Sequence, residues 1–216
     1  MDGNTAFQRL RGRLTRRRPV LAVPLGLLDW APGEKPGTDG RAFFAPPDWF
    51  AAADTEDVLL HSVLHAMLGH PWTRGRRDAA RWDLACDIAA EFLRLRLLDK
   101  PLEGLYAKAF YACGDGAAYS ARCVCAWLEG DCPIAQDELR EAFRRDSHAY
   151  WSAAAQREQR AGASGDRARH PVPHEPGPEL GELVGWVAAA QQVQGRVVRR
   201  PRQLGERRRA AHQVVE

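Results

Sequence analysis

The segment from residue 54 to residue 68 constrains the fold most strongly, because it predicts a helix with apolar residues on every side. Asp54 is a capping residue, and acidic residues follow it in the first turn. Gly69 ends the helix, and Pro71 prevents its continuation. The apolar residues lie all around the helix: Val58, Leu59, Leu60, Val63, Leu64, Ala66, Met67 and Leu68. Such a helix is a buried one, so the chain must build a core around it.

Two histidines, His61 and His65, lie four residues apart on this helix. This spacing places them on one face, where they can bind a single metal ion. Buried imidazoles without partners are costly, and a metal would satisfy both, although a pair of satisfied core histidines is the alternative. In the HExxH pattern of zinc proteases, the residue after the first histidine is a glutamate that acts as general base. Ser62 occupies that position here, and a hydroxyl has no useful basicity near neutral pH.

The composition is that of an ordinary soluble globular protein. The 216 residues are 45% hydrophobic and 27% charged, and they include no run of 18 apolar residues that would predict a membrane span. The arginine-rich start lacks a continuous apolar region, so we do not expect a secretory signal. Five cysteines, an odd number, favour a reducing cytoplasm over a disulfide scaffold.

Charge is distributed unevenly along the chain. Residues 1–18 and residues 196–216 each carry +5, so the net charge of +3 leaves −7 for residues 19–195. The basic ends could contact an anionic partner or the acidic body, or they could be solvated tails. They contain few aromatic residues, so we expect no nucleic-acid binding beyond a non-specific contact with phosphates.

The pattern of apolar residues predicts a mixed α+β fold that is mainly helical. We expect helices over 6–17, 48–53 and 78–98, and mostly helical structure over 104–160. Val20–Trp30 and Arg41–Ala45 predict two strands of a β-hairpin. The chain is predicted to begin with a basic segment (1–18) followed by a main domain (19–160). A linker rich in Gly and Pro (161–178) then leads to an amphipathic helix with a basic tail (179–216).

Several short segments follow one another in a recognisable order: residues 18–19 and 38–46, the HExLHxxLxH-like segment 60–70, the WNxAxDxxxN-like segment 81–89 and the DDHxxW-like segment 145–151. Together they resemble a family of bacterial metallopeptidase domains associated with VWA-like domain proteins. The resemblance implies a zincin-like domain in which His61 and His65 bind one Zn²⁺ per chain. It also implies a VWA-like domain protein as a partner, although another protein could take that role.

The third metal ligand has two candidates. The resemblance favours Asp87, which occupies the acidic position of the WNxAxD-like segment, although it could instead be a solvated carboxylate. His70 is the other candidate, because Gly69 can turn the chain back toward the metal. It comes one residue earlier than in proteases with a third histidine.

Ser62 leaves the function of such a site open. The leading hypothesis is a zinc-binding, metallopeptidase-like protein whose peptidase activity is lost or impaired. One alternative is an active zinc hydrolase that uses Asp146, His148 or Glu91 as its base. Another is a non-enzymatic module for protein interaction. Asp57, one turn before His61, could orient an imidazole or act only as an acid at the helix N-terminus.

Four cysteines lie within twenty residues of one another. They are Cys113, Cys123, Cys125 and Cys132. Four thiolates could bind a second zinc, but no CxxC pair is present. We therefore expect buried free thiols that pack as small apolar side chains.

Overall fold

A computed structural model describes residues 2–114, 116–130 and 132–152. The chain divides into two units, Met1–Gly177 and Pro178–Glu216, and every described residue belongs to the first. The linker predicted over 161–178 and the amphipathic helix with its basic tail lie outside the described residues. The described part is mainly helical and contains one small sheet, which confirms the expected α+β class.

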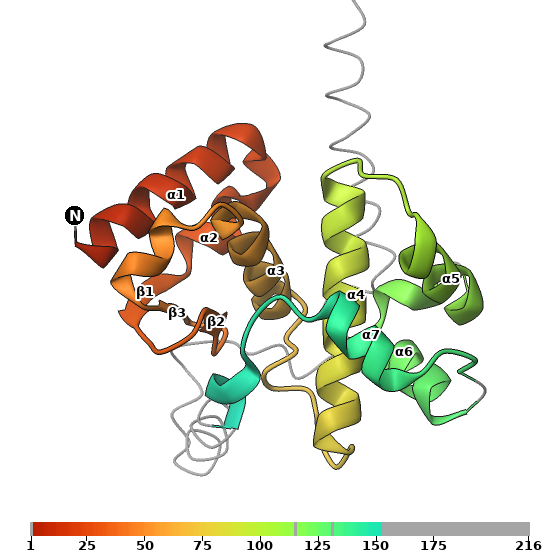
Figure 1. The fold of residues 1–216 in the computed structure, drawn as a ribbon. Coiled ribbons are helices and arrows are strands. Elements are labelled where there is room, and N and C mark those ends of the chain that lie inside the picture. Colours follow the sequence, from red (N-terminus) through yellow and green to blue (C-terminus); the bar gives the residue numbers. More distant parts are fainter. Residues whose placement is uncertain (1, 115, 131, 153–216) are drawn as a thin grey trace, which may run out of the picture. The chain divides into compact units, whose positions relative to one another are not determined.

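The N-terminal part of the fold combines short helices with the sheet (Figure 1). Along the chain its elements are α1 (Gly3–Arg17), the 3-10 helix η1 (Pro19–Leu21), α2 (Ala22–Gly26), β1 (Asp29–Pro32), β2 (Gly37–Thr38), β3 (Ala42–Ala45), the 3-10 helix η2 (Pro47–Ala51) and α3 (Thr55–Met67). The basic segment predicted over 1–18 is thus largely helix α1. It buries Phe7, Leu10 and Leu14, while Arg13 and Arg17 form ion pairs with Glu56 of α3.

The sheet has three strands in the order β1-β3-β2. β1 pairs with β3 in parallel, with Asp29 opposite Ala42, and β2 pairs with β3 in antiparallel fashion. The predicted hairpin was therefore only partly right, because residues 19–26 are helical and β2 forms the antiparallel pair. Pro24 lacks the N–H that an inner strand needs, and a short apolar run cannot be assigned from its periodicity alone.

Two long helices form the centre of the described structure. α3 runs over Thr55–Met67, close to its predicted bounds, and α4 (Ala79–Leu97) begins at Asp78, whose side chain accepts a hydrogen bond from the backbone N–H of Arg81. Both predictions are confirmed. α4 packs against α3 and against helices from the second half of the chain, so most of its residues are buried (Figure 1).

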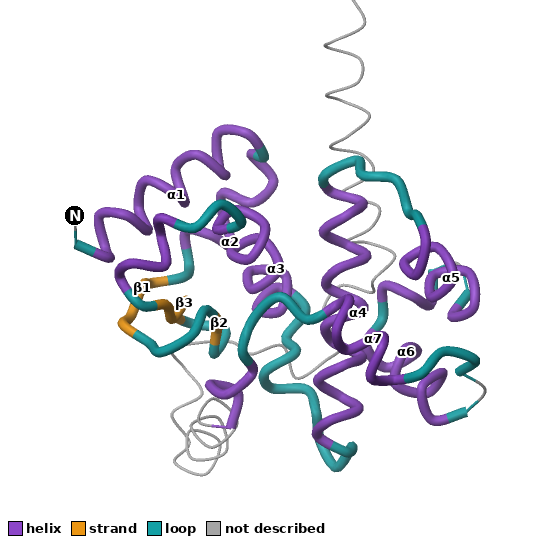
Figure 2. The backbone as a smooth tube through the Cα atoms, viewed as in Figure 1, coloured by secondary structure: helices purple, strands orange, loops and turns teal. Residues whose placement is uncertain are grey.

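The second half of the described chain is helical, as predicted. It contains α5 (Gly104–Cys113), η3 (Ala117–Tyr119), α6 (Ala121–Glu129), α7 (Gln136–Phe143) and η4 (His148–Tyr150). Phe92 of α4 contacts Phe110 and Phe143 edge to face, which joins α5 and α7 to the core. After α7 the chain continues through a loop to η4, close to β2 (Figure 2).

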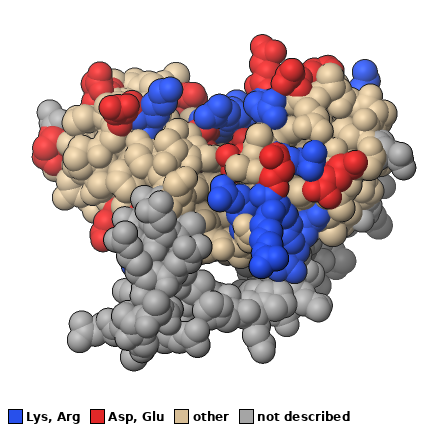
Figure 3. All heavy atoms as spheres, turned by 90° about the horizontal axis from the view of Figure 1, so that it is seen from below, with Lys and Arg blue, Asp and Glu red and all other residues tan. Residues whose placement is uncertain are grey.

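Among the described residues, no helix is long and apolar enough to cross a membrane. Basic and acidic side chains both appear on the face shown in Figure 3, and the largest group of basic ones lies below the centre of the view.

Candidate metal centre

Helix α3 supplies two histidines whose rings face each other inside the protein. His61 and His65 are both fully buried, as predicted from the apolar helix around them. One helical turn separates them, and their Nε2 atoms lie 2.9 Å apart. Two ring nitrogens at this distance need a proton or a cation between them.

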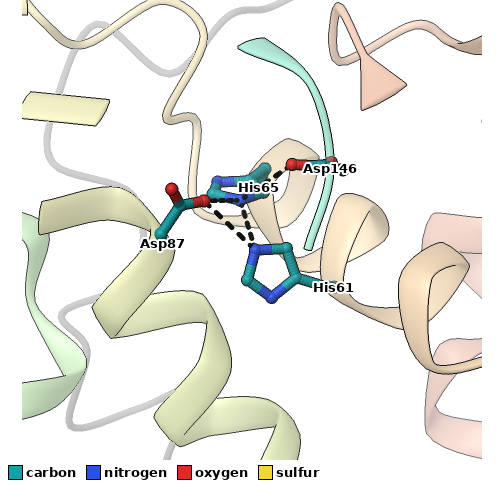
Figure 4. Close-up of side chains that lie close together, drawn as sticks. All are labelled: His61, His65, Asp87 and Asp146. Atoms are coloured by element: carbon teal, nitrogen blue, oxygen red, sulfur yellow. Dashed lines mark hydrogen bonds and ion pairs between the residues drawn. The ribbon is translucent and has the colours of Figure 1, made fainter. Parts of the chain in front are cut away.

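Helix α4 brings a carboxylate to the same point (Figure 4). Asp87 Oδ1 lies 3.3 Å from His61 Nε2 and 3.4 Å from His65 Nε2. The Asp87 side chain is almost fully buried, so it is not a solvated surface carboxylate. The two imidazole nitrogens and this oxygen thus converge from two different helices.

A fourth group comes from the loop between α7 and η4. Asp146 Oδ1 lies 3.8 Å from His65 Nε2, and Asp146 Oδ2 accepts a hydrogen bond from Ser62 Oγ. One ligand atom each from His61, His65, Asp87 and Asp146 lie within 4.8 Å of one another, and all four residues are buried. We call these four residues the metal group. It can hold a metal ion, because imidazole nitrogens and carboxylate oxygens are common metal ligands.

The loop that carries Asp146 is fastened to the sheet. The backbone N–H of Ser147 donates to the carbonyl oxygen of Pro36, 2.8 Å away. The ring of Tyr150 stacks on Phe44 of β3 with 4.2 Å between the ring centroids. These contacts hold Asp146 against α3 although 84 residues separate it from Ser62.

Behind the metal group, a network of charged side chains supports His61. Glu91, one turn after Asp87 on α4, places Oε2 3.3 Å from His61 Nδ1. Arg94 donates two hydrogen bonds of 2.7 Å to the Glu91 carboxylate, and Arg145 donates a third of 3.0 Å. Asp57 pairs with Arg94 at 2.9 Å, so it supports the network through that arginine. A carboxylate on the distal nitrogen fixes the orientation of a metal-binding imidazole.

His70 lies on the far side of His65. Its Nδ1 is 2.8 Å from His65 Nδ1, whereas the Nε2 of His65 faces Asp87. His70 is buried, and its carbonyl oxygen accepts a hydrogen bond from Trp82 Nε1. This geometry makes His70 a partner that orients His65, and Asp87 rather than His70 reaches the point where the two Nε2 atoms meet.

His148 also comes to the metal group, from the first residue of η4. Its Nε2 lies 3.0 Å from Asp87 Oδ1 and 3.4 Å from Asp146 Oδ1. The imidazole stacks on Trp151, with 3.6 Å between the ring centroids. Asp146 and His148, which the sequence suggested as an acid and a base from a distant segment, therefore lie beside the histidines of α3.

Burial and nearby charges together shift the pKa values of the two α3 histidines in opposite directions. Burial lowers the pKa of His61, but Asp87 and Glu91 outweigh it and raise this pKa to about 9. Burial dominates at His65, where the pKa falls to about 4 despite Asp146 and Asp87. Of the two α3 histidines, His61 therefore carries a proton at neutral pH and His65 is neutral.

The carboxylates are held in their ionised form. Burial alone would raise the pKa of Asp146, but His148, His65 and His61 lower it to about 2. Burial also opposes the ionisation of Glu91, yet Arg94 and His61 hold its pKa well below the usual range. Ionised carboxylates beside neutral or exchangeable imidazoles form a suitable set of metal ligands.

Arg94 and Arg145 are supporting residues that the sequence did not single out. Arg94 follows Glu91 by three residues on the same helix, a spacing that could have indicated an ion pair. Arg145 is next to Asp146, but only the folded chain shows that it reaches Glu91. The sequence offered no signal for that contact.

The four clustered cysteines are free, as expected, but they are not all buried. Cys125 is buried, Cys113 and Cys132 are half-buried, and Cys123 is exposed. Burial raises the pKa of the Cys113 thiol to about 11. Within the parts of the chain that the structure describes, the group able to hold a metal contains no cysteine.

Comparison with known protein families gives a match in the N-terminal part of the chain. Residues 5–95 match a family model described as "Putative metallopeptidase domain", and this range contains His61, His65 and Asp87. No curated protein and no solved structure matches the chain. Asp146 and His148 lie beyond the matched residues.

Proposed function

We propose that this chain is a zinc-binding protein related to metallopeptidases, with its peptidase activity lost or strongly impaired. The convergence of His61 Nε2, His65 Nε2 and Asp87 Oδ1 carries the proposal, because these atoms lie 2.9–3.4 Å apart in a buried site. The match to a metallopeptidase family model over the same residues supports it.

The residues fit zinc well. Ligand atoms around one tetrahedral zinc, each at about 2.0–2.1 Å, lie about 3.3 Å from one another. The distances of 3.3 and 3.4 Å from Asp87 Oδ1 to the two histidines match that spacing. Two imidazoles with carboxylates also suit other divalent metals, so metal analysis must identify the ion.

Ser62 is the reason to propose that the peptidase activity is lost or strongly impaired. A bound zinc ion would supply Lewis-acid chemistry, but a peptidase also needs a base to take a proton. The hydroxyl of Ser62 instead donates a hydrogen bond to Asp146 Oδ2. Glu91, another candidate base, is engaged by Arg94 and His61 behind the site. Residue 62 therefore cannot serve as the general base of the HExxH pattern.

One observation favours a second candidate, an active zinc hydrolase. The Asp146 carboxylate lies directly beside residue 62, and the His148 imidazole lies next to it. Either group could take over the proton transfer that the missing glutamate would perform. In this alternative, activity depends on residues far from α3 in the sequence.

A VWA-like domain protein as partner and a cytoplasmic location also belong to the proposal. The partner rests on the resemblance of the sequence segments to the family. The location is supported by the cysteines of the described residues, which are all free.

Metal analysis of the purified chain tests the proposal. We expect about one zinc per chain, and loss of zinc from a variant with His61→Ala and His65→Ala. Replacement of the exposed Tyr111 by Ala is a matched control that should leave the zinc content unchanged. Absence of zinc after reducing, chelator-free purification would contradict both candidates.

Peptide hydrolysis separates the two candidates. The impaired protein should show no turnover, and Ser62→Glu should gain some if only the base is missing. Turnover by the wild-type chain that disappears in His148→Ala or Asp146→Asn, with zinc retained, would favour the active hydrolase.

A further inference from the structure

The two oxygens of the Asp146 carboxylate have different surroundings. Oδ2 accepts the hydrogen bond from Ser62, whereas the buried Oδ1 accepts no hydrogen bond from the described residues and has imidazole nitrogens of His148 and His65 at 3.4 and 3.8 Å. The side chain has no exposed surface. A buried carboxylate oxygen that accepts no hydrogen bond is costly, and a metal ion at Oδ1 would satisfy it.

The Asp146 Oδ1 atom lies next to the other atoms that would bind the metal. Asp146 Oδ1 is 3.8 Å from His65 Nε2, and it belongs to the group of four atoms that lie within 4.8 Å of one another (Figure 4). A divalent ion among them would meet two carboxylates, Asp87 and Asp146, and two neutral imidazoles. The charge of the ion and the charges of these four ligands would then cancel, which favours the ion in a buried site.

We propose that Asp146 is the fourth protein ligand of the metal, so that the site is closed. This inference rests on the proposed zinc binding and specifies its consequence. Catalytic zinc sites use three protein ligands and leave one position for water or substrate, whereas structural sites use four. Ser62, in the position of the HExxH glutamate, orients this extra ligand through its hydrogen bond to Oδ2.

His148 is less well placed to be the fourth ligand. Its Nε2 contacts the carboxylates of Asp87 and Asp146, at 3.0 and 3.4 Å from their Oδ1 atoms. Its ring is fixed by stacking on Trp151. We therefore assign His148 the role of holding the two carboxylates in place.

A closed site gives the metal a structural role. Its ligands come from α3, α4 and the loop after α7, so the ion would join three segments that are distant in the sequence. Such an ion stabilises the fold instead of activating a substrate.

Cobalt substitution of the full chain tests this assignment. Co²⁺ replaces zinc and has a visible spectrum that reports exchangeable ligands. For wild-type protein with one cobalt per chain, we expect no spectral shift on addition of azide. In Asp146→Ala the freed position should let azide bind, which would shift the spectrum in a saturable way. Asp137→Ala removes an exposed carboxylate and should behave like wild type.

Other outcomes of the cobalt experiment also decide between the proposals. A spectral shift with azide in wild-type protein would overturn the assignment while leaving zinc binding intact. The same holds for an azide-induced shift in His148→Ala that is absent in Asp146→Ala. Failure of wild-type protein to bind cobalt or zinc would instead overturn the proposed function. If Asp146→Ala does not hold cobalt, water-proton relaxation of the wild-type cobalt protein decides: slow relaxation supports the closed site, and fast relaxation from an exchanging water refutes it.

Discussion

The two histidines of α3 differ in protonation although they share a helix and a metal group. His61 faces two carboxylates, Asp87 and Glu91, while His65 faces His61 and His70 across its ring. The carboxylates raise the pKa of His61 to about 9 in spite of burial, whereas burial is the main reason why the pKa of His65 falls to about 4. A metal ion must displace the proton of His61, whereas His65 is already in its ligand form.

Metal binding should therefore release a proton from His61. Below about pH 9, this proton competes with the metal, so apparent affinity should rise by about tenfold per pH unit as the pH increases toward that value. Calorimetric titration in buffers of different ionisation enthalpy measures the released proton. Glu91→Gln removes a carboxylate that raises the pKa of His61, so this variant should release less. Equal release by both proteins would argue against this role of Glu91.

At the scale of elements, the loop between α7 and η4 determines whether the metal group is complete. It brings Asp146 to α3 and is fastened to the sheet through Ser147 and Tyr150. Gly37 of β2 lies directly beneath this loop, where an added Cβ would meet the backbone oxygen of Ser147. Since that neighbour is backbone, it cannot move aside as a flexible side chain would.

Gly37→Ala should displace this loop. We expect a loss of about 1–3 kcal/mol in the free energy of unfolding from the added methyl group, together with weaker zinc binding. Chemical denaturation and zinc titration measure the two effects. Gly26→Ala is the matched control, because a Cβ there meets nothing within 4 Å, and it should change stability by no more than about 0.5 kcal/mol. Similar losses in the two variants would mean that the loop is not held by this contact.

The elements also differ in how far the sequence predicted them. α3 and α4 lie close to their predicted bounds because each combines a start signal with a long apolar pattern. The strand predicted over Val20–Trp30 was mostly wrong, since η1 and α2 occupy its first part. Tertiary packing decides such short apolar runs, and no local pattern records it.

At the scale of the whole molecule, the metal group lies where the two halves of the described chain meet. The family match ends at residue 95, yet Asp146 and the supporting Arg145 come from the second half. The metal would therefore be linked to the folding of both halves. A ligand that binds only the folded state stabilises it by mass action.

Zinc should accordingly raise the thermal stability of the chain. At a free zinc concentration 100 times the Kd, the gain is about 2.7 kcal/mol, which corresponds to a rise in Tm of roughly 5–10 °C for a chain of this size. Differential scanning calorimetry with zinc and with a chelator measures it. The His61→Ala, His65→Ala variant should show no rise, and an equal rise in that variant would place the stabilising zinc elsewhere.

The amino-acid sequence was enough to predict the buried helix, its two facing histidines and the lack of a carboxylate at residue 62. These features follow from local spacing, because residues four apart on a helix share a face wherever the helix packs. The folded chain was needed to show that Asp87 lies where His61 and His65 meet, that His70 lies behind His65, and that Asp146 reaches Ser62. Those contacts depend on how α4 and the loop after α7 pack against α3, and local spacing does not encode the packing between distant segments.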